Sequence, residues 1–148
     1  MSRARQQAEQ QFTNVPLYQD MYAFIYPFQP RNYKAYINLK CPLTPELKQR
    51  GLMFLESIPE DAGMIFYNTT RLYMNMTMKN TRIPLDMIFV KNNRIDFIWK
   101  NTTPYDDRTA YTSNNVTDFV IEVNAGFSDK YQLQVGDQVY LRVDPPQL

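Results

Sequence analysis

Four carboxylic acids and one lysine are the side chains of this sequence that could carry chemistry together: Asp61, Asp86, Glu122, Asp137 and Lys79. Paired carboxylates do acid–base work, as in glycoside hydrolysis, when they are held about 5 to 10 Å apart. In the structural alternative, Asp61 and Asp137 cap turns, and Lys79, Asp86 and Glu122 form an ion-pair network that locks a turn. We favour the structural alternative, because such networks are more often structural than catalytic.

The composition removes several other kinds of site. The chain has no histidine, which is the commonest general base and metal ligand. Its single cysteine, Cys41, cannot form an internal disulfide or a cysteine zinc site. Met74, Met76 and Met78 could bind a soft metal through thioethers, but methionine in a row that faces a core more often fills gaps. We therefore predict no catalytic residue, no metal, no cofactor and no enzyme activity.

Length and charge restrict the class of protein further. A chain of 148 residues with 44% hydrophobic residues is one globular domain by size. A net charge of +1 argues against nucleic-acid binding, through Arg3 and Arg5 or otherwise, which needs a basic excess on one face. No run approaches the ~20 apolar residues of a membrane span, and the polar start MSRARQQAEQQ predicts no signal peptide. The expected location is the cytoplasm or a virion.

Residues 72–90, LYMNMTMKNTRIPLDMIFV, form the segment around which the acidic residues are arranged. Apolar residues alternate with polar ones from 72 to 79, which predicts a strand with one dry face. Asn80 to Arg82 and Pro84 predict a turn or bulge. Residues 85–90 are a second apolar run, and Asp86 within it needs partners if it is buried.

The segment 78–89, MKNTRIPLDMIF, resembles the signature of the domain-of-unknown-function 192 family, a set of small β-rich proteins. The motif positions are Met78, Lys79, Asn80, Thr81, Pro84, Leu85 and Asp86. Residues 51–54, 59–66, 122–126 and 135–139 resemble other family segments, so the similarity covers roughly residues 35 to 143. Leu55 and Thr77 stand where the family usually has an arginine and a bulky aromatic residue. The resemblance implies a fold, and the family has no established activity.

The remaining pattern predicts short strands joined by turns. Alternating or continuous apolar residues predict strands at 33–41, 63–67, 95–99, 117–124 and 138–143. Asn92 and Asn93 predict a hairpin turn, and Thr44, Pro45 and Gly51 predict the cap, first turn and end of a short helix. One or two helical turns are expected between 126 and 132, with Ser128 as a possible cap. This pattern predicts an all-β fold, mainly an antiparallel β-sandwich or small barrel, in one domain over residues 34–148.

Residues 1–33 are predicted to be an extended N-terminal arm. Pro16, Pro27 and Pro30 exclude a continuous helix and a central strand. Aromatic side chains would anchor the arm on its own domain, covering a sheet edge, or on a neighbouring subunit. The candidate partner-binding residues are Phe12, Tyr18, Tyr22, Phe24, Tyr26 and Phe28.

These features favour a non-catalytic structural or interaction module whose partners are the protein subunits of a larger assembly. A phage virion is one such assembly, with the protein as capsid decoration, connector or tail component. The alternative is a domain that binds, or hydrolyses, a small ligand or carbohydrate through Asp86, Glu122 and Lys79. The polar segment 101–116 is at the upper end of ordinary loop length, which is typical of functional or mobile loops.

Overall fold

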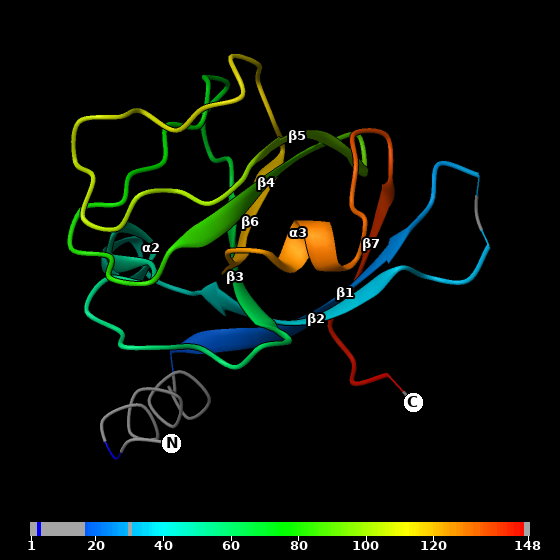
Figure 1. Cartoon of the computed structure of the whole chain (residues 1–148), viewed down its shortest axis with the longest axis horizontal. Coiled ribbons are helices and arrows are strands. Elements are labelled where there is room, and N and C mark those ends of the chain that lie inside the picture. Colours follow the sequence, from blue (N-terminus) through cyan, green and yellow to red (C-terminus); the bar gives the residue numbers. More distant parts are fainter. Residues whose placement is uncertain (1–2, 4–16, 30, 147–148) are drawn as a thin grey trace.

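The computed structural model of the chain describes residue 3 and residues 17–29 and 31–146. In this part of the chain, seven strands and two short helices form the fold (Figure 1). The strands are β1 (Tyr18–Tyr26), β2 (Ala35–Pro42), β3 (Ala62–Tyr67), β4 (Leu85–Lys91), β5 (Arg94–Trp99), β6 (Phe119–Asn124) and β7 (Gln138–Arg142). The helices are α2 (Pro45–Arg50) and α3 (Phe127–Lys130). The predicted all-β class with short helices is confirmed.

The strands close into a barrel in the order β1-β2-β3-β6-β4-β5-β7. Neighbouring strands are antiparallel, except that β2 and β3 pair in parallel. The ladder that closes the barrel, between β5 and β7, has one residue pair, Arg94 with Gln138, and flanking backbone hydrogen bonds such as Ile95 to Asp137 extend the contact. Of the two predicted architectures, the chain adopts the small barrel, and its sheet is mixed.

Two hydrophobic clusters lie on opposite faces of the same strands. The first contains side chains from all seven strands and Phe127 of α3, so it fills the barrel interior. The second takes its buried strand residues from β3, β4 and β6, such as Met64 and Met87, and adds loop residues such as Leu52. Tyr18 of β1 and Trp99 of β5 are half-buried against it. Successive side chains of a strand point to opposite faces, so this second cluster packs outside the barrel. Burial on both faces explains why residues 85–90 read as a continuous apolar run.

Three loop segments, residues 51–58, 72–84 and 100–118, cover the outer face of β3, β4 and β6, and we refer to them as the outer layer. In Figure 1 the segments at 72–84 and 100–118 lie beside one another next to β4 and α2. The prediction of a strand at 72–79 is wrong, because this stretch contributes only one isolated bridge, between Met76 and Tyr111. Leu72 is 69% exposed, Met74 and Met76 are half-buried and Met78 is fully buried, so packing against the barrel increases toward the C-terminal end of the stretch.

Several turns form where local sequence signals predict them. The β4–β5 hairpin turns at Asn92 and Asn93, both with positive φ. The Thr44 hydroxyl accepts a hydrogen bond from the Leu47 amide, which caps α2, and the helix ends at Gly51 with φ 52°. In α3, however, the N-cap is Gly126, and Ser128 lies within the helix.

The predicted arm is a barrel strand over part of its length. Residues 18–26 form β1, which pairs with β2 on one side and with β7 on the other. The prediction failed here because prolines limit a strand only where they occur, and nine residues fit between Pro16 and Pro27. Phe12 lies outside the described residues.

No helix in the described part of the chain is long and apolar enough to cross a membrane.

Candidate ligand-binding site

The predicted polar cluster is dispersed over the molecule. Lys79 is exposed and forms no ion pair within the described part of the chain. Asp61 is also exposed and accepts a hydrogen bond from the Asn38 side-chain amide at 3.0 Å. Asp137 is buried and accepts hydrogen bonds from the Lys34 ammonium at 2.9 Å and the Gln134 amide at 2.9 Å. Only Asp137 therefore caps a turn as predicted.

Asp86 is held on the inner face of the sheet. It has the same parity along β4 as Ile88 and Val90, which line the barrel interior. Its two oxygens accept hydrogen bonds from the backbone amides of Asn101 at 3.0 Å and Ser128 at 2.9 Å. Asp86 is therefore a satisfied structural carboxylate that joins α3 to the start of the 101–116 loop.

Glu122 lies on the other face of the sheet, in the outer layer. It sits between Met64 on β3 and Met87 on β4 in the strand register, and both methionines are buried. Glu122 is 4% exposed, and no described residue forms a hydrogen bond or ion pair with its carboxyl group. Burial raises the pKa of this carboxyl to about 8. The predicted network of Lys79, Asp86 and Glu122 is wrong, because the two acids point to opposite faces.

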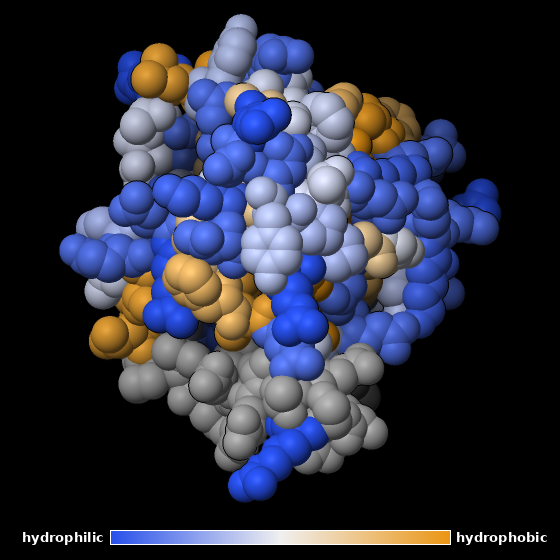
Figure 2. Space-filling view, turned by 60° about the vertical axis from the view of Figure 1, so that its left-hand side comes forward, coloured by the Kyte–Doolittle hydropathy of each residue, from blue (hydrophilic) through white to orange (hydrophobic). Residues whose placement is uncertain are grey.

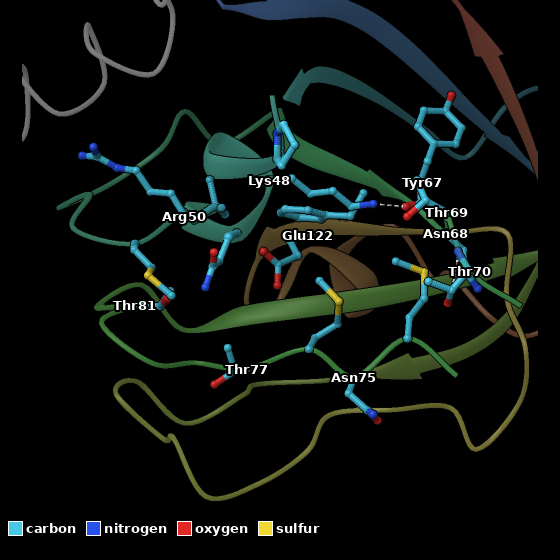
Figure 3. Close-up of a pocket in the computed structure, with 18 of the residues that line it drawn as sticks. Lys48, Arg50, Tyr67, Asn68, Thr69, Thr70, Asn75, Thr77, Thr81 and Glu122 are labelled. Carbon is cyan, nitrogen blue, oxygen red and sulfur yellow. Dashed lines mark hydrogen bonds between the residues drawn. The ribbon is translucent and has the colours of Figure 1, made fainter. Parts of the chain in front are cut away.

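The Glu122 carboxyl faces a pocket with a volume of about 430 Å³ between α2 and the segment 68–77. Figure 3 shows the carboxyl pointing into this space from β6, with Thr77 on the facing segment and Arg50 directed away. The apolar part of the wall includes Leu52, Phe66, Met74 and Met76, and the polar part includes Gln49, Asn68, Thr69, Thr70, Thr77 and Thr81. Glu122 is the one carboxylic acid among the described residues that line the pocket.

Basic side chains reach the pocket from α2, which has no buried residue and lies at the surface. The Lys48 ammonium donates a hydrogen bond to the Tyr67 carbonyl oxygen, and its side chain crosses the pocket in Figure 3. The Arg50 guanidinium lies over the Phe54 ring at 5.5 Å. Figure 2, which brings the left-hand side of Figure 1 forward, shows a face that is mostly hydrophilic. The pocket thus has a buried acid at its floor and a cation at its rim.

The model of the DUF192 family, described as "Uncharacterized ACR", matches residues 28–141. The chain belongs to the DUF192 family. Two solved structures are similar to this chain. One is a "putative transcription regulator" from Sinorhizobium meliloti, with 25% identity and a TM-score of 0.77, covering 86% of this chain and 97% of that one. The other is a protein of unknown function from Novosphingobium aromaticivorans, with 29% identity and a TM-score of 0.72, covering 80% of this chain and 83% of that one. No curated protein matches the sequence.

The two positions at which the sequence departs from the pattern of the resemblance, Leu55 and Thr77, lie in the outer layer. Leu55 packs against the outer hydrophobic cluster, and Thr77 lines the pocket. Glu122, on the other side of the same pocket, has no basic partner among the described residues.

The predicted partner-binding aromatics pack against the protein's own residues. Tyr22 stacks on Tyr36 with ring centroids 6.3 Å apart, and Phe24 contacts Tyr33 at 5.0 Å. The other described members also have contacts: Tyr26 meets Tyr33, Tyr18 packs on the outer cluster, and Phe28 lies under the Arg94 guanidinium. Whether this surface binds a partner remains a prediction.

Sequence reasoning missed most of the pocket. It selected Glu122, but it did not select Lys48, Asn68 or Thr70. Two features of the sequence indicated polar lining: the polar residues at every second position from 73 to 79, and the cluster Asn68-Thr69-Thr70. These residues come from separate loops, however, and nothing in their spacing places α2 over β6.

Proposed function

We propose that this protein binds a small organic ligand in the pocket between α2 and residues 68–77, and that Glu122 orients the ligand. The observation that carries the proposal is the Glu122 carboxyl, which is buried, faces a cavity and has no partner within the described residues. Buried polar groups are normally hydrogen-bonded, and leaving one without a partner costs about 1 to 3 kcal/mol. A bound ligand would supply the missing partner.

The dimensions and lining of the pocket support binding of a small molecule. A volume of about 430 Å³ lies within the range of roughly 300 to 1,000 Å³ that is typical of ligand sites. The wall combines apolar side chains such as Phe66 and Met76 with polar ones such as Asn68 and Thr81. A concave site that contains a carboxyl with a strongly raised pKa is a typical functional-site candidate.

Binding fits this pocket better than hydrolysis does. Glycoside hydrolysis with acid and base requires two carboxyl groups across the substrate. Glu122 is the single carboxyl group of the described lining, and Asp86 faces the barrel interior on the opposite side of the sheet. The carbohydrate-binding alternative from the sequence therefore survives as one class of ligand, without the hydrolytic step.

The role as a subunit of a larger assembly is now the weaker proposal. Its main argument was a free aromatic arm, and residues 18–26 of that arm are a strand of the barrel. The composition argument for a virion component remains a prediction. Light scattering after size-exclusion chromatography would test it, because a subunit of this kind should self-associate or bind its neighbours.

A thermal-shift screen tests the binding proposal. The panel should hold neutral mono- and oligosaccharides, amino acids, amines, carboxylic acids and nucleosides. A true ligand at a concentration of 100 times its Kd stabilises the folded state by about 2.7 kcal/mol. This raises Tm by roughly 5 to 10 °C at this chain length. The shift should disappear in Glu122→Gln and persist in Glu60→Gln, which makes the same change at an exposed site outside the pocket lining. A panel without any Glu122-dependent shift would overturn the proposal.

A further inference from the structure

We propose that the ligand is a zwitterionic α-amino acid with an apolar side chain, whose ammonium binds Glu122 and whose carboxylate binds Lys48. This inference rests on the proposed function and names the class of molecule that the same pocket takes. Three features of the pocket lead to it: the acid at the floor, the base at the rim and the apolar part of the wall.

Once ionised, the carboxyl at the floor of the pocket only accepts hydrogen bonds, so it binds a ligand group that donates them. Met64 and Met87 flank Glu122 across the strands, and neither can donate a hydrogen bond. No described residue donates to the carboxyl either. An ammonium group brings three donors and a positive charge, and charge-assisted hydrogen bonds are about twice as strong as neutral ones. A hydroxyl group would bring only one donor and no charge.

The rim of the pocket requires a negative group. The Lys48 ammonium uses one of its donors on the Tyr67 carbonyl oxygen and has two more. It forms no ion pair within the described part of the chain. A simple amine would enter against this positive charge, whereas a molecule that carries its own carboxylate would be attracted by it. The order of charges from floor to rim therefore matches an amino acid with its ammonium inward.

The apolar part of the wall suits the side chain, which branches from the carbon atom that carries both charged groups. Leu52 and Phe66 lie on one side, and Met74 and Met76 lie on the segment opposite α2. Thioethers adapt their shape to different apolar groups, and the ring of Phe66 can also contact a cation through its face.

The other titratable groups of the described lining do not compete for the ligand's ammonium. They are Lys48 and Arg50 on α2, Tyr67 at the end of β3 and Tyr73 on the facing segment. Burial raises the pKa of Tyr67, so this side chain stays neutral at physiological pH. Glu122 is consequently the acid that must ionise to hold a cation, and binding should become tighter as the pH rises toward 8.

Calorimetric titration with L-leucine, L-methionine and L-phenylalanine tests this inference, with the N-acetyl and C-amide derivative of each as matched probes. We expect at least one free amino acid to bind. Its N-acetyl derivative should bind at least 10-fold more weakly, as should its amide. The affinity of the free amino acid should increase about 10-fold per pH unit between pH 6 and 7.5, because Glu122 must lose its proton.

Variants separate the contributions of the two charged residues. Glu122→Gln should abolish the pH dependence and weaken binding at least 10-fold, Lys48→Met should weaken the free acid but leave the amide unchanged, and Glu60→Gln should behave as wild type. Equal binding of the N-acetyl derivative would overturn this inference, a result that does not depend on how any variant folds. A neutral sugar whose binding requires Glu122 would also overturn it while the proposed function stands. If no class of compound binds in a Glu122-dependent way, both proposals fail.

Discussion

The buried carboxyl of Glu122 makes the stability of the protein depend on pH in an unusual direction. Its pKa is raised from 4.5 to about 8 in the folded chain. Between these two values the folded state holds a proton that the unfolded state has lost, so the free energy of unfolding falls as the pH rises. The stabilising contribution is complete below about pH 4.5 and is lost progressively up to about pH 8. Most carboxylates that are paired in a folded protein act in the opposite direction.

Glu122→Gln removes this dependence and retains the shape of the protonated acid. The shift corresponds to about 5 kcal/mol over the whole window, at about 1.4 kcal/mol per pH unit. Between pH 5 and 7.5, the free energy of unfolding of the wild type should therefore fall by about 3 kcal/mol relative to that of the variant. The two proteins should have similar stability near pH 5, and the variant should be the more stable one at pH 7.5.

Urea unfolding followed by fluorescence is a suitable assay, because Trp99 is the only tryptophan of the sequence. Its indole nitrogen donates a hydrogen bond to the Thr112 carbonyl oxygen at 2.8 Å, so its surroundings change when the outer layer separates from the sheet. The measurement should be repeated at pH 5, 6, 7 and 8 for wild type, Glu122→Gln and the exposed control Glu60→Gln. Parallel profiles for wild type and Glu122→Gln would refute the reasoning, since a solvated or paired carboxyl gives no such difference.

Three further substitutions test the structure. Asp137→Asn leaves the Lys34 ammonium without its charge partner and should lower the free energy of unfolding by about 3 kcal/mol in urea titrations; a change under about 0.5 kcal/mol would contradict the ion pair. Tyr111→Phe removes a hydroxyl that donates to Asp106 at 2.8 Å and accepts from the Thr103 amide at 3.2 Å, so it should cost about 1 to 2 kcal/mol and accelerate hydrogen exchange at Thr103. Unchanged exchange there would show that this hydroxyl does not hold the loop. Gly63→Ala would place a Cβ 2.4 Å from the Glu122 carbonyl oxygen and should lower Tm sharply, and an unchanged Tm would mean that β3 and β6 are not this close.

Local features of the fold followed from the sequence because their causes are local. Asn92 and Asn93 set a hairpin through their own tolerance of positive φ, and Thr44 caps α2 three residues away from the amide that it binds. Period-two patterns identified β2, β6 and β7 for the same reason. Residues 72–79 have the pattern of a strand, yet they pair at one bridge only. A two-residue period shows which side chains are buried. A loop that packs on a sheet can bury every second side chain, as a strand does.

The candidate site depended on information that the sequence does not contain. Asp86 faces the barrel interior and Glu122 faces the outer layer. The sequence could not reveal this, because it does not show that β4 and β6 are neighbours with both faces buried. It therefore placed the two acids in one network. Nor could it show that Asp86 obtains backbone donors from Asn101 and Ser128 while Glu122 obtains none from the described residues. Burial alone did not distinguish the two acids, and their hydrogen-bond partners did.

The outer layer also determines where this protein can be modified. Loops usually accept fused tags and inserted domains better than strands do, but residues 72–84 supply Met78 and Ile83 to a packed cluster. An insertion there would pull apart a second core, with the same effect as breaking a strand. The Asn92–Asn93 turn is exposed and supplies nothing to either cluster. A fluorescent label or an affinity handle attached at this turn would leave both hydrophobic clusters intact.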